Sequence, residues 1–124
     1  MKFARIVFLI AGIYGILVIA PQYFLEQTLA QQSQHPFYHP EYFYGFLGVT
    51  LAWQIVFLMI ASDPIRFRPI MFAALVEKLG FGVAIPILYV LHRVPLNMMA
   101  AACIDLVLLV LFVMAIFGTA KVKT

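Results

Sequence analysis

Long apolar segments dominate the chain, and short polar stretches separate them. Hydrophobic residues do not alternate with polar ones as they would in strands, and a helix needs about 20 apolar residues to cross a bilayer core about 30 Å thick. Helices also satisfy their own backbone hydrogen bonds in lipid. The sequence therefore predicts an all-α membrane protein, an antiparallel bundle of four transmembrane helices in one domain, 1–124, with spans at about 4–25, 42–62, 69–92 and 97–118.

The connections between the predicted spans differ in length. Pro64 and Pro95 lie in two short turns between antiparallel neighbours, and proline disfavours helix continuation there. The first connection, 21–41, predicts a long loop outside the membrane between the first two helices, with residues 24–29 as a short amphipathic surface helix. Pro21 directly after Ala20 disfavours cleavage of the first span as a signal peptide.

The composition agrees with a membrane protein and excludes other classes. Hydrophobic residues make up 65% of the chain and charged residues 10%, whereas soluble domains have about 45–50% and about 25%. A disordered chain would have few aromatic residues and a high net charge. The single cysteine, Cys103, excludes an internal disulfide and the paired-thiol redox enzymes.

The basic residues are distributed unevenly around the predicted spans. Arg93 is the one basic residue in a connection on the opposite side from six others: Lys2, Arg5, Arg66, Arg68, Lys121 and Lys123. Cytoplasmic loops carry the excess of lysine and arginine. We therefore expect a multi-pass protein of the bacterial inner (plasma) membrane with both termini in the cytoplasm. Membrane lipids are then the expected partners of these charges, and nucleic acid is not.

Polar side chains occur at similar depth in several predicted spans. Gln54, Glu77, Lys78, Asp105 and Tyr14 all fall within about 5 Å of the span midpoints at about 1.5 Å per residue. A charged residue at a helix centre costs about 2.5–3.5 kcal/mol on the insertion scale. These groups must therefore pair with one another, lose their charge or reach water inside the bundle.

The expected pairing follows from helix geometry. Neighbouring residues point about 100° apart on a helix, so Glu77 and Lys78 are not expected to face each other. We expect instead an ion pair between Lys78 and Asp105, with Glu77 directed towards Gln54 or Tyr14.

Several functions remain open for this polar cluster. The leading hypothesis is a non-enzymatic, accessory protein that binds a hydrophobic small molecule or a partner subunit, with Glu77, Lys78, Asp105 and Gln54 as the polar end of the site. Tyr14 and Trp53 would line it. The first alternative is a proton-coupled small-molecule transporter acting as a homo-oligomer, and the second is a lipid-modifying or isomerising enzyme with a carboxylate as acid and base. A purely structural cluster is the remaining interpretation.

No cofactor, metal or catalytic motif is expected from the sequence. His35, His39 and Glu41 have a spacing that binds zinc on a helix. Pro36 and Pro40 follow the two histidines directly, however, and disfavour helical structure before them.

Short motifs and the overall layout carry a resemblance to a known family. They are residues 41–46 (Glu-Tyr-Phe-Tyr-Gly-Phe), 51–54 (Leu-Ala-Trp-Gln), Asp63-Pro64, 66–69 (Arg-Phe-Arg-Pro) and Glu77-Lys78. Together with the size, the four spans and the long outer loop, they resemble small bacterial DoxX-like membrane proteins of unassigned function. That resemblance implies an association with quinone-linked or redox-linked membrane complexes, and it transfers no catalytic residue.

Overall fold

The structure of the chain is helical throughout its described part. The computed structural model describes residues 2–32 and 39–120, and it contains no strand in these ranges. Four helices are long and apolar enough to cross a membrane, which confirms the predicted number and type of elements. They are α1 (Lys2–Ile19), α3 (Pro40–Ser62), α4 (Arg68–Val90) and α5 (Asn97–Thr119). His35, Pro36, Lys121 and Lys123 lie outside the described residues.

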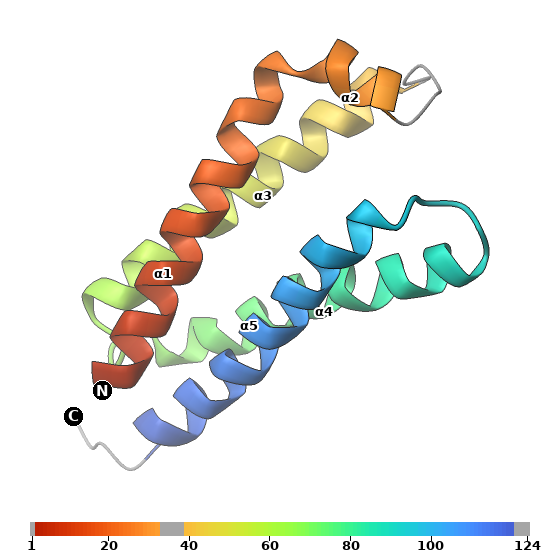
Figure 1. Ribbon diagram of the computed structural model, residues 1–124. Coiled ribbons are helices and arrows are strands. Elements are labelled where there is room, and N and C mark those ends of the chain that lie inside the picture. The colour runs from red at the N-terminus through yellow and green to blue at the C-terminus, as the bar shows by residue number, and fades with distance from the viewer. Residues whose placement is uncertain (1, 33–38, 121–124) are drawn as a thin grey trace.

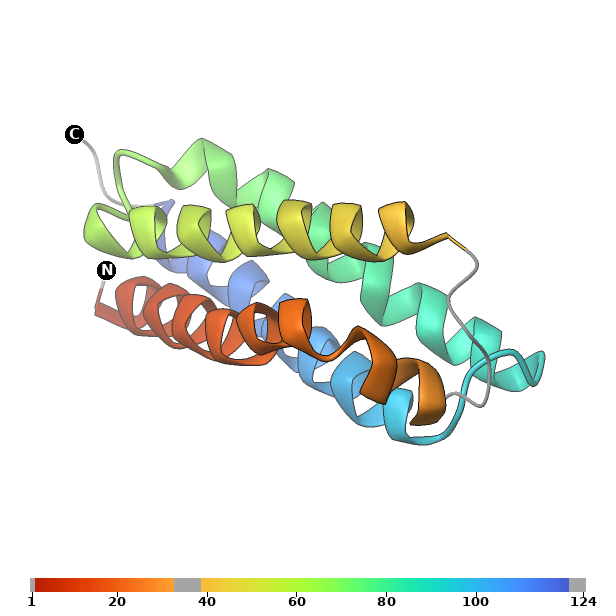
Figure 2. The ribbon, with the colours of Figure 1, turned by 90° about the horizontal axis from the view of Figure 1, so that it is seen from above.

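The long helices form two hairpins that pack against each other. α1 packs along α3, and α4 packs along α5, while α1 also contacts α5. Contact between α3 and α4 is sparse by comparison. Successive long helices run in opposite directions, so the start of α1, the α3–α4 turn and the end of α5 lie at one end of the molecule (Figures 1 and 2). We call this the terminal end.

The segment after the first long helix is more helical than expected. The apolar helical segment runs from Lys2 to Phe24, close to the predicted span at 4–25, but its α-helical part, α1, ends at Ile19 and a 3-10 helix, η1 (Ala20–Phe24), completes it. Pro21 explains the change, because its ring clashes with the preceding turn and its nitrogen has no proton to donate. The short helix α2 (Glu26–Gln32) comes next and overlaps the short helix expected at 24–29. Tyr44 of α3 donates a 2.9 Å hydrogen bond to Glu26 Oε2, which anchors α2.

Tight aromatic packing is concentrated towards the terminal end. Phe8, Phe57 and Phe112 are each 0% exposed and come from α1, α3 and α5. The ring of Phe112 stacks on Phe8 with a centroid distance of 4.2 Å and meets Phe57 edge-on at 5.1 Å. This cluster therefore joins both hairpins into one core.

Arg68 fastens the start of α4 to the end of α5. Its guanidinium donates hydrogen bonds to the Ile116 carbonyl, from Nη2 at 3.1 Å and from Nε at 3.3 Å. Nε also donates to Thr119 Oγ1 at 3.1 Å. The last carbonyls of a helix lack intrahelical partners and carry partial negative charge, so a cation is stabilised at this position.

Candidate functional site

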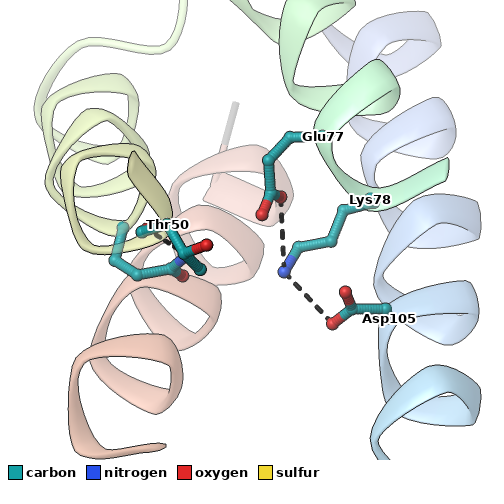
Figure 3. A network of polar contacts seen from close by, with 5 residues as sticks. Thr50, Glu77, Lys78 and Asp105 are labelled. Atoms are coloured by element: carbon teal, nitrogen blue, oxygen red, sulfur yellow. Dashed lines mark hydrogen bonds and ion pairs between the residues drawn. The ribbon is translucent and has the colours of Figure 1, made fainter. Parts of the chain in front are cut away.

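A buried ion cluster lies at the contact between the two hairpins. Lys78 of α4 is 3% exposed, and its Nζ donates a 3.3 Å hydrogen bond to Asp105 Oδ1 of α5 (Figure 3). The expected pair between Lys78 and Asp105 is confirmed. Nζ also lies 3.6 Å from Glu77 Oε2, which corrects the expectation that these neighbours do not face each other. The long, flexible lysine side chain brings its ammonium group back to the carboxylate on its own helix.

The ion cluster rests directly on the aromatic core. Lys78 Nζ lies 5.2 Å from the centre of the Phe57 ring, and an ammonium group is attracted to an aromatic face at this distance. On the terminal side the lysine is therefore closed off by packed aromatic rings. The other side of the cluster faces a cavity.

Gln54 presents a buried acceptor without a hydrogen-bond partner. The residue is 1% exposed, and its Nε2 donates a 2.8 Å hydrogen bond to the Thr50 carbonyl one turn earlier. Because a carbonyl only accepts, this bond fixes which way the amide is turned. Oε1 has no partner within the described part of the chain. A Cβ placed on Gly15 would overlap this oxygen, so the glycine provides the space that the amide occupies.

A cavity of about 290 Å³ extends from the ion cluster between the hairpins. Five of the six predicted site residues line it, namely Tyr14, Gln54, Glu77, Lys78 and Asp105. Apolar residues form most of the remaining wall, and they come from every long helix, with Leu29 of α2 and Gln22 of η1 at the far end. These include Val18, Ile19, Phe46, Phe81, Met98 and Ala101.

Trp53 lies outside this cavity, contrary to the expectation. It lines a second depression, which we call the α3–α4 hollow, on the outer side of the contact between α3 and α4. Trp53 precedes Gln54 by one residue, which places the two side chains about 100° apart around α3, so these neighbours face different sides of the helix. Its ring lies 6.2 Å from that of Phe57.

Several residues of the cavity wall were not predicted from the sequence, and only some of them could have been. Phe81 follows Glu77 by one helical turn and therefore shares its face, and this periodicity was a usable signal. Met98 and Leu29 carry no such signal, because their positions depend on where the α4–α5 turn and α2 are placed in space.

Of the three residues with zinc-like spacing, the structure describes His39 and Glu41 but not His35. Within residues 2–32 and 39–120, no three histidine, cysteine or acidic residues gather in a group suited to a metal ion. His39 Nδ1 lies 3.0 Å from Glu41 Oε1, and both side chains are well exposed. This pair is a local surface interaction at the start of α3.

No protein-family model matches the chain, and no match is found among curated proteins or among solved structures. The resemblance to DoxX-like proteins therefore stays a prediction.

Proposed function

We propose that this chain is an integral membrane protein that binds a small, mostly apolar molecule between its two hairpins. The observation that carries the proposal is the cavity itself, which has apolar walls and ends at a buried ion cluster. Ligand sites are typically concave and apolar, with a few polar groups that orient the ligand, and have volumes of about 300–1,000 Å³. The volume of about 290 Å³ suits a ligand at the small end of that range.

The proposed location is the bacterial inner membrane, with both termini in the cytoplasm. Arg5, Arg66 and Arg68 all lie towards the terminal end, whereas Arg93 lies in the turn after α4. The positive-inside rule places the terminal end on the cytoplasmic side. The cavity then lies in the half of the bundle that faces away from the cytoplasm. An accessory role beside a partner subunit is part of the same proposal.

A proton-coupled transporter is the second candidate, and one observation favours it. Two carboxylates, from Glu77 and Asp105, share the single ammonium group of Lys78. The carboxylate in excess is a group that can take up and release a proton. This candidate predicts that Glu77→Gln abolishes proton-dependent flux in liposomes while the helical content stays unchanged.

Native mass spectrometry with a cavity-filling variant tests the binding proposal. Ala101 lines the cavity, whereas its neighbour Ala100 is exposed on the outer face of α5. We expect a small molecule to remain bound to the protein released gently from membranes. It should be lost from Ala101→Leu and retained by the matched control Ala100→Leu. Equal retention by both variants would place the molecule outside the cavity and overturn the proposal.

A further inference from the structure

The charges around the cavity do not balance. Its charged lining residues are Glu77, Lys78 and Asp105, so two carboxylates face one ammonium group. Asp105 accepts the hydrogen bond from Lys78. Glu77 Oε2 lies farther from Nζ, at 3.6 Å, and has no hydrogen-bond partner within the described residues. Glu77 is thus the carboxylate that a bound cation would satisfy.

The unpartnered polar atoms at the cavity have the same chemical character. Glu77 Oε2 and Gln54 Oε1 are both acceptors, and leaving a buried acceptor without a donor costs about 1–3 kcal/mol. A ligand that donates hydrogen bonds therefore gains more here than one that only accepts them. A carboxylic acid would instead bring a third negative group to a site that already has two.

Glu77 also lines both the cavity and the α3–α4 hollow on the outer side of the bundle. Four residues line both the cavity and the α3–α4 hollow: Phe46, Thr50, Glu77 and Phe81. The rings of Phe46 and Phe81 meet across this contact with a centroid distance of 6.4 Å. Figure 3 shows Glu77 directed from α4 into the space between the hairpins. One layer of side chains therefore separates the cavity from the outside along the α3–α4 contact.

The helices on either side of this contact are loosely joined. α3 and α4 touch much less than the two helices within each hairpin do. A Cβ on Gly80, which lines the hollow, would meet nothing within 4 Å. Moving Phe46 and Phe81 apart would open a path from the bilayer to Glu77 without separating either hairpin.

We propose that the ligand is a lipophilic amine, which enters from the bilayer between α3 and α4 and places its ammonium group against the carboxylate of Glu77. The inference rests on the proposed ligand-binding function and specifies its chemical class. The apolar part of the amine occupies the space lined by Phe81, Val18 and Ile19, and Lys78 keeps its pairing with Asp105.

Three probes of equal chain length but different head groups test the ligand class. Decylamine, decanol and decanoic acid are each added to the purified protein, and bound adducts are counted by native mass spectrometry. We expect decylamine to bind at least about tenfold more tightly than the other two, because a charge-assisted hydrogen bond contributes enough free energy for a tenfold difference in affinity. Glu77→Gln should remove that preference, so that decylamine binds no more tightly than decanol does to the same variant. The matched control Glu26→Gln lies outside the cavity lining and should keep the preference.

The outcomes separate this inference from the function on which it rests. One outcome is that all three probes bind the unchanged protein equally and that Ala101→Leu abolishes this binding. That result overturns the preference for an amine and retains a ligand-binding cavity. Binding of none of the probes, together with an empty cavity in protein released from membranes, overturns both. The comparison among probes in the unchanged protein remains decisive even where Glu77→Gln fails to fold.

A second variant tests the route of entry. Phe81→Ala removes one ring from the barrier, and we expect decylamine both to associate and to dissociate several-fold faster. Loss of a wall contact alone would speed dissociation but not association. The control Ile87→Ala changes a side chain that is 55% exposed on the same helix and is not part of the cavity wall. Dissociation rates that are equal in the two variants would overturn entry between α3 and α4.

Discussion

Lys78 Nζ lies 3.3 Å from Asp105 Oδ1, so an ion pair joins the two helices of the second hairpin at the wall of the cavity. Both side chains are largely withdrawn from solvent, with exposed fractions of 4% and 14%. Burying two charges is costly, and their attraction offsets that cost only while both partners are present. Substituting these two residues therefore tests whether the ion pair contributes only to the stability of the fold.

Removing one partner should destabilise the protein more than removing both. We expect Lys78→Met to lower the free energy of unfolding by about 3–5 kcal/mol, the usual cost of leaving a buried charge without its partner. Lys78→Met with Asp105→Leu should recover much of this loss, because an apolar pair of similar volume often replaces a buried ion pair without cost. Thermal unfolding in detergent, followed by circular dichroism, measures both.

Ligand binding by the same double variant separates a structural cluster from a functional one. A folded double variant that still binds decylamine as the unchanged protein does would show that the Lys78–Asp105 pair only stabilises the bundle and that Glu77 alone holds the amine. Loss of binding with the fold retained would show that its charges serve the ligand. A double variant as unstable as Lys78→Met alone would contradict the pairing argument.

Gly15→Ala should displace the Gln54 amide. The added Cβ would overlap Oε1 and Cδ of Gln54, so the amide must move from its place against α1. We expect a loss of about 1–3 kcal/mol in the free energy of unfolding, as for other overpacked sites. Combining it with Gln54→Ala should restore most of the loss. Gly45→Ala is the control, because a Cβ there meets nothing within 4 Å, and an effect equal to that of Gly15→Ala would contradict the prediction.

Arg68→Met should weaken the contact between the start of α4 and the end of α5. The substitution removes the hydrogen bonds to the Ile116 carbonyl and to Thr119 Oγ1, and hydrogen bonds to charged groups contribute about 1.5–3 kcal/mol. Arg66→Met is a matched control, because it removes one positive charge from the same turn at an exposed position. Equal unfolding temperatures for the two variants would show that the bonds of Arg68 add nothing to stability.

The four long helices and the ion pair between Lys78 and Asp105 could be predicted from the sequence, for physical reasons. Long apolar segments have few alternatives to helices in a membrane, so the four spans were predictable to within a few residues. The change from α-helix to 3-10 helix at Pro21 within the first of them was not predicted. The Lys78–Asp105 pair was predictable because charges at equal depth must find each other. The path of the lysine side chain back to Glu77 was not, because it depends on rotamers that helix periodicity does not fix.

The cavity depended on information that local patterns do not contain. Gln54 and Trp53 are neighbours in sequence, yet they line different depressions, because the angle at which α4 meets α3 decides which face closes over each. The hydrogen bond between Tyr44 and Glu26 likewise ties α2 to α3, and no local pattern in the sequence predicts it. Polar residues at similar depth predicted a polar cluster between the helices, and the packing of the hairpins determined the shape of the cavity beside it.

The orientation of the bundle can be tested by labelling cysteines at its two ends. Cys103 is exposed, so Cys103→Ala provides the background for Ser62→Cys near the α3–α4 turn and Asn97→Cys at the start of α5. Neither added cysteine changes the charge that sets the topology. In spheroplasts, a membrane-impermeant maleimide should label Asn97→Cys directly and Ser62→Cys only after permeabilisation. The reverse pattern would place the cavity in the cytoplasmic half, and equal labelling of both variants would show that the chain inserts in two orientations.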